Sequence, residues 1–143
     1  MPSTPSEIKA EELIIQLLKI PDLLSTVPIV HFDADAGGSG KRIVVKVEEG
    51  TLRTDGPGGF DYRVDISVKG LEGDQVTWDD WRAAIETRMN TEVTGTPPAA
   101  FLAARAQFSF FRPPPKQEQS SERDRTDAIR TGTQIFQFIA KAI

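Results

Sequence analysis

The chain of 143 residues contains no cysteine and one histidine, His31. Without cysteine, the chain cannot form a disulfide, a thiolate zinc site or a cysteine nucleophile. One histidine also excludes a metal site built from several histidines of one chain. No apolar run approaches the about 18 residues of a membrane span, so we expect no membrane partner. The first residues are polar and acidic, which is unlike a signal peptide, so we expect synthesis and assembly inside a cell.

Positive charge is also scarce, because 17 basic residues face 21 acidic ones and the net charge is −4. This balance argues against nonspecific nucleic-acid binding as the main task, because phosphate binding needs a basic surface. The net charge does not exclude a local basic patch. The size and the apolar share of 38% are those of one folded domain, which we expect to span residues 1–143.

The first third of the chain predicts one helix over residues 5–20. Thr4 is a good N-cap, Pro5 suits the first helical position, and Glu7 would complete a capping box. Pro21 ends the helix. A wide apolar face predicts that this helix packs on a core.

Three strands are predicted next, over residues 27–33, 42–53 and 60–69. The third has the clearest pattern, because apolar and charged or polar residues alternate strictly from Phe60 to Lys69. A glycine-rich turn at residues 54–59 precedes it. This arrangement predicts a long antiparallel hairpin between the second and third strands.

A second helix is expected to begin at Thr77 as N-cap, with two aspartates in its first turn, and to run to about Asn90. Its stripe of apolar residues is interpreted as core, with a docking patch as the alternative. The stripe comprises Trp78, Trp81, Ile85 and Met89.

A fourth strand is expected over residues 101–112, followed by a polar, proline-rich arm or loop at about residues 113–127. Residues 128–143 fit a helix or a strand. We favour a strand that pairs with residues 101–112, because Thr131, Gly132 and Thr133 disfavour a helix. The predicted fold class is therefore α+β, a mostly antiparallel sheet with helices packed on it.

Two segments suggest ligand chemistry. Residues 37–41 resemble a phosphate loop, but Asp35 stands where that motif needs glycine, and Arg42 where it needs serine or threonine. A strand follows instead of a helix, so we expect no nucleotide and no other cofactor. His31, Asp33 and Asp35 would project to one side of a strand, as metal ligands do, but hard cations need more oxygen ligands, so no metal site is predicted.

Catalytic residues are not expected either. The paired carboxylates are neighbours in sequence and diverge on regular elements, and no serine occupies a nucleophile elbow. The charged side of the third strand fits a solvated face or a subunit interface, because alternating signs can fix the register between copies. Our interface candidates are Arg63, Asp65 and Lys69.

The order of these segments resembles a known family. A helix that ends at a proline is followed by a short strand, then by Arg42–Val47, a glycine-rich hairpin and Gly59–Val68. A helix opens at Thr77-Trp78-Asp79-Asp80-Trp81, and the chain ends with Ala104–Phe111 and Ile135–Ala140. This layout resembles the tail terminator, or tail-completion (minor tail), proteins of long-tailed bacteriophages and the related neck proteins.

The resemblance implies a structural virion protein without catalytic residues. Its subunits would form a homo-oligomeric ring, usually of about six copies, that caps the tail tube and joins it to the head or neck. The partners would be the tail tube protein and the neck or connector proteins, with DNA passing through the ring without specific binding. The protein would be assembled in the host cytoplasm and located at the head-proximal end of the tail. A neck or head–tail connector subunit, a non-phage binding module, and an enzyme or metal protein are the alternatives.

Overall fold

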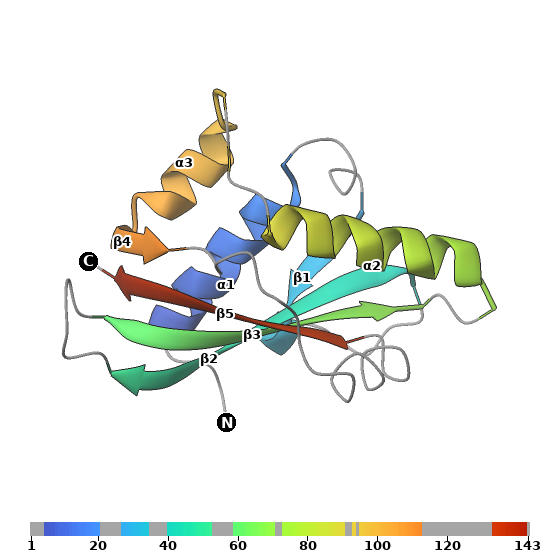
Figure 1. The fold of residues 1–143 in the computed structure, drawn as a ribbon, viewed down its shortest axis with the longest axis horizontal. Helices are drawn as coiled ribbons and strands as arrows, with labels where there is room; N and C mark the ends of the chain where they lie inside the picture. Colours follow the sequence, from blue (N-terminus) through green and yellow to red (C-terminus); the bar gives the residue numbers. More distant parts are fainter. Residues whose placement is uncertain are drawn as a thin grey trace.

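The computed structural model describes residues 5–20, 27–34, 40–52, 59–70, 73–90, 93, 95–112 and 133–142. Figure 1 shows how the elements are arranged. In chain order they are α1 (Pro5–Leu18), β1 (Ile29–His31), the 3₁₀ turn η1 (Phe32–Ala34), β2 (Arg42–Leu52), β3 (Phe60–Lys69), α2 (Gln75–Met89), α3 (Ala99–Arg105), β4 (Phe108–Arg112) and β5 (Thr133–Ala142).

The described strands form one five-stranded sheet in the order β1-β2-β3-β5-β4. β1 runs parallel to β2, and every other neighbouring pair is antiparallel. The predicted α+β class and the hairpin are therefore confirmed. The last segment is a strand that pairs with β4, as expected, but it also pairs with β3 and lies between the two.

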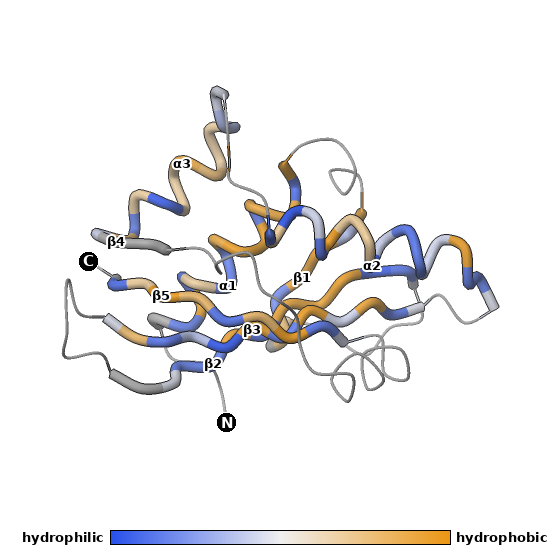
Figure 2. Tube along the Cα trace, viewed as in Figure 1, coloured by the Kyte–Doolittle hydropathy of each residue, from blue (hydrophilic) through white to orange (hydrophobic). Residues whose placement is uncertain are grey.

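Alternation along β3 and β5 gives the sheet one apolar face, which Ile43, Val45 and Val47 of β2 continue, whereas Val44 is buried on the other face of β2. The register sets Val45 opposite Ile66 and Val47 opposite Val64, and β5 continues the row with Phe136. The ring of Tyr62 stacks on that of Phe138 with 5.1 Å between centroids. Figure 2 shows the alternation of apolar and polar residues along the strands.

The described helices pack on this apolar face. α1 contributes the largest buried set, Ala10, Leu13, Ile14, Ile15, Leu17 and Leu18. In α2, Ile85 and Met89 are buried, while Trp78 and Trp81 are partly buried against the same core. The interpretation of this stripe as core is therefore confirmed.

The start of α2 differs from the prediction. The helix begins at Gln75, and its N-cap is Asp74, whose side chain accepts a hydrogen bond of 3.2 Å from the Thr77 amide. Thr77 lies inside the first turn. Aspartate and threonine are both good N-cap residues. Because Gln75 and Val76 belong to the helix, Asp74 and not Thr77 is its N-cap.

The strand predicted over residues 101–112 is wrong in its first half, where α3 forms. Pro98 precedes this helix, and four of its seven residues are alanine, the best helix former. Phe101 and Ala104 are buried at a spacing of three, which a helix satisfies and strict strand alternation does not. The strand predicted over residues 27–33 is also shorter, because the chain enters η1 after His31.

Some predictions concern residues that lie outside the described ones. These are the Thr4 cap, most of the glycine-rich loop at residues 35–39, and the arm at about residues 113–127. Among the helices that the structure describes, none is long and apolar enough to cross a membrane.

The glycine before β3 gives the first prediction. Gly59 has φ +92°, and a Cβ there would clash with the Ala140 carbonyl oxygen on β5. Gly73 has φ +85°, but a Cβ there meets nothing within 4 Å. Gly73→Ala should lower the free energy of unfolding by about 1–2 kcal/mol, because alanine is strained in the left-handed backbone region. Gly59→Ala should lower it clearly more, because the added Cβ also clashes with Ala140. Urea unfolding measures both, and equal losses would contradict the close approach of β3 and β5.

Candidate functional site

The N-terminal half of α1 continues the hydrogen-bond ladder of β2 where β1 stops. β1 pairs with β2 only up to Val45, and on this edge the Ile43 amide donates to the Pro28 carbonyl at 2.9 Å. Further along the edge, the Val47 amide donates to Glu11 Oε2 at 3.2 Å, and the Glu49 amide to Glu7 Oε2 at 2.8 Å.

The spacing of these groups explains why helix and strand fit each other. Glu7 and Glu11 are four residues apart, so they lie on one helix face. Val47 and Glu49 are two residues apart, so their amides point to the same edge of the sheet. Two carboxylates therefore occupy an edge that would otherwise present unpaired N–H groups to another strand.

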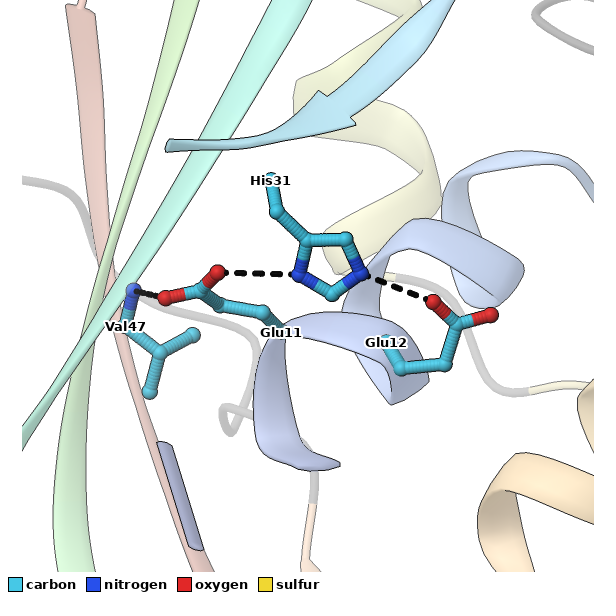
Figure 3. A network of polar contacts seen from close by, with 4 residues as sticks. All are labelled: Glu11, Glu12, His31 and Val47. Carbon is cyan, nitrogen blue, oxygen red and sulfur yellow. Dashed lines mark hydrogen bonds and ion pairs between the residues drawn. The ribbon is translucent and has the colours of Figure 1, made fainter. Parts of the chain in front are cut away.

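Glu11 is the most deeply buried charged side chain of this group, with 1% exposed. Its second oxygen, Oε1, lies 3.0 Å from His31 Nδ1 (Figure 3). A buried carboxylate needs hydrogen-bond partners, and here the strand amide and the imidazole supply them.

The other ring nitrogen of His31 meets a second carboxylate. Nε2 lies 2.9 Å from Glu12 Oε2 (Figure 3). The Gln16 amide donates to the other oxygen, Glu12 Oε1, at 2.8 Å. The side chain of Glu12 is 45% exposed and that of His31 is 28% exposed. Ionised carboxylates only accept hydrogen bonds, so both contacts are hydrogen bonds only when both ring nitrogens carry a proton.

The pKa shifts of His31 and Glu12 follow from this arrangement. Burial acts to lower the pKa of His31, but the hydrogen bonds and charges of Glu11 and Glu12 outweigh it, so this pKa is raised. Burial acts to raise the pKa of Glu12, but its hydrogen bonds to Gln16 and His31 outweigh it, so this pKa is lowered. Both groups therefore favour the charged form.

The metal pattern considered for His31, Asp33 and Asp35 rested on a wrong assumption, because the strand ends at His31. The side chains of the two aspartates lie outside the described residues. Among the side chains that the structure describes, no three histidine or acidic residues are arranged to hold a metal ion. The signal that sequence reasoning missed was Glu11, an acidic residue within the apolar face of α1.

The opposite face of the sheet, here called the open face, carries the predicted interface residues. On β3, Arg63 Nε donates to Asp65 Oδ1 at 2.9 Å. On the neighbouring strand β2, Lys46 Nζ lies 3.1 Å from Glu48 Oε1. The register places Glu48 beside Arg63 and Lys46 beside Asp65. At these four positions, charges of opposite sign therefore alternate both along and across the strands. The structure brings Arg63 and Asp65 together, whereas Lys69 lies near the far end of β3 opposite Arg42.

Two apolar side chains add to the open face and were not predicted. Ile135 is 41% exposed and lies in register with Asp65. Phe32 is 44% exposed, and the ammonium group of Lys46 lies 4.7 Å from the centroid of its ring. Single exposed apolar side chains are common on protein surfaces, and here two of them lie among paired charges.

No protein-family model matches the chain, and neither a curated protein nor a solved structure matches it. Inference about function therefore depends on the residues of this chain.

The buried carboxylate gives the second prediction. Glu11→Ala leaves the Val47 amide and one His31 nitrogen without their acceptor, and should cost about 2–4 kcal/mol of unfolding free energy. Glu12→Ala is the matched control on the same helix. Because Glu12 is half exposed, its removal should cost no more than about 1 kcal/mol. Denaturant unfolding measures both, and equal losses would contradict the role of the buried ladder contact.

The pH dependence of stability gives the third prediction. The pKa of His31 is raised, so its contribution is fully present below the unfolded pKa of about 6.5 and is lost as pH rises through the folded pKa. The pKa of Glu12 is lowered, so its contribution is present above about pH 4.3 and is lost as pH falls through the folded pKa. The network should therefore be strongest between these two limits.

Comparison of wild type with His31→Gln isolates this contribution. The difference in unfolding free energy should be largest between about pH 5 and pH 6.5, and should shrink as the pH rises further. Thermal or urea unfolding across this range measures it. A difference that does not change with pH would contradict a protonated ring in the folded state.

Proposed function

We propose that the chain is a structural subunit of a bacteriophage tail, a tail terminator that assembles into a ring at the head-proximal end of the tail tube. The observation that carries this proposal is the open face of the sheet. Its interleaved charges and exposed apolar side chains form a surface suited to another protein, and the described helices occupy the opposite face.

The charge pattern favours contact with further copies of the same chain. Arg63 and Asp65 on β3 lie beside Glu48 and Lys46 on β2, so each strand presents both signs. Such a surface can pair with complementary charges while like charges reject wrong registers. Ile135 supplies apolar area within the same pattern.

The closed edge of the sheet supports association through faces and loops. Beyond β1, Glu7 and Glu11 hold the amides of β2, so a neighbouring subunit cannot add a strand there without displacing α1. A ring needs two different surfaces on each subunit, because the contacts run head to tail. The open face would provide one of these surfaces.

The proposed partners are further copies of the chain, the tail tube protein, and the neck or connector proteins. The DNA of the phage would pass through the ring without specific binding, which agrees with a net charge of −4. The role needs no cofactor and no catalytic step, because tube capping and head joining depend on contact surfaces alone.

The fourth prediction tests the ring. Light scattering over a concentration series should give a native mass that rises toward about six protomers. Arg63→Glu should lower this mass, because it reverses one charge of the open face. It also sets an acidic group beside Asp65 and Glu48, so we expect a loss of monomer stability of no more than about 1 kcal/mol.

Lys9→Glu on α1 is the matched control, since it reverses the same charge on the helical side of the molecule. It should leave the native mass unchanged. If both variants keep the wild-type mass, the open face is not the interface. If the wild type is a monomer at all concentrations and stays so with purified tail tubes, the terminator role is wrong.

A further inference from the structure

His31 lies between two carboxylates that differ sharply in exposure. Glu11 is 1% exposed, and its Oε2 accepts a hydrogen bond from the Val47 amide. Glu12 is 45% exposed, and Gln16 already binds its second oxygen. Both belong to α1, whereas His31 is the last residue of β1, so the ring joins the helix to the edge strand (Figure 3).

We propose that His31 is a proton-operated clamp, in which loss of one ring proton releases Glu12 from β1 while the contact with Glu11 is kept. The proposal is independent of the assembly role and concerns a conformational device within the subunit.

The choice of contact follows from what each carboxylate would lose. A neutral imidazole has one N–H and one lone pair, so only one of the two carboxylates can keep a hydrogen bond, and the other faces a lone pair. Glu11 is 1% exposed, so its Oε1 could not replace the ring N–H with water, and this loss is costly for a buried carboxylate. Glu12 can turn to solvent and retain Gln16 as a partner. The proton therefore stays on Nδ1, and the contact at Nε2 opens.

The charged groups around the ring support the same order of events. Glu11 and Glu12 face it from α1, and Lys19 at the end of α1 acts on Glu12. On β2, the group directed toward this network is the Val47 amide, which donates to Glu11. The nearby cation of β2, Lys46, lies on the open face against Phe32. The side chains of Asp33 and Asp35 lie outside the described residues.

The release would loosen β1 locally. This strand pairs with β2 over three positions, and its other edge has no strand partner among the described residues. Short edge segments with few contacts open at low free-energy cost. With the ring protonated, two carboxylates hold β1 to α1, and with the ring neutral, one does.

The test uses nuclear magnetic resonance of the full chain between about pH 5 and pH 9. The chain has one histidine, so every imidazole signal belongs to His31. The titration midpoint should lie above about 6.5, and the ¹⁵N shifts of the neutral ring should show the proton on Nδ1. Protection of the β1 amides that bond to β2 should fall severalfold as the ring deprotonates, while the Val47 amide stays protected.

Glu12→Gln separates the clamp from general alkaline loosening. An amide can accept from Nε2–H or donate to the bare nitrogen, so this variant should titrate at lower pH than wild type and keep β1 protection constant. Glu86→Gln on the exposed side of α2 is the control and should behave as wild type. A neutral ring protonated at Nε2, a midpoint no higher than that of Glu12→Gln, or β1 protection that falls equally in both variants would overturn the proposal.

Discussion

The hydrogen bond from the Val47 amide to Glu11 is the contact on which the arrangement of α1, β1 and β2 depends. β2 is 11 residues long, whereas β1 covers only its first part, so the rest of this edge needs other acceptors. Glu7 and Glu11 provide them, which fixes both the position and the rotation of the helix. That rotation in turn directs the leucines and isoleucines of α1 onto the sheet, where burial of apolar area supplies most of the stability.

The two faces of the sheet differ in what their side chains contribute. The helical face is filled by aliphatic and aromatic side chains, whose packing determines the fold. The open face carries paired charges that are partly solvated, and such pairs add little to the stability of a monomer. The alternation of the four charges Lys46, Glu48, Arg63 and Asp65 is the basis of the proposed contact with further copies of the chain.

Sequence reasoning succeeded where the residue pattern fitted the period of a strand and excluded that of a helix. Strict alternation left one interpretation for β3, whose bounds were predicted without error, and the glycine at residue 132 favoured a strand for the last segment. It failed over residues 101–112, where small and apolar residues satisfied a strand and a helix alike, and alanine content decided for α3. The insertion of β5 between β3 and β4 was not predictable from local pattern, because strand order depends on long-range contacts.

Sequence reasoning missed the network around His31 for a related reason. It joins residues about 20 and 36 positions apart, and the strand pattern directed attention to Asp33 and Asp35 instead of to α1. Glu7 was assigned to a capping box, and no role was predicted for Glu11. Only the end of β1 at His31, and the unpaired edge it leaves on β2, give these carboxylates their role.

β1 connects this network to the open face, because His31 faces α1 and the next residue, Phe32, lies against Lys46. In the proposed clamp, a change in the attachment of β1 would therefore reach an exposed aromatic ring at the border of the proposed interface. A single titrating group changes such an equilibrium by at most tenfold per pH unit, so in one subunit the clamp acts as a modest bias. In the proposed ring the same bias would be present in every copy, and the contributions of the subunits would add in free energy. Symmetry would thus turn a weak local linkage into a marked pH dependence of the whole assembly.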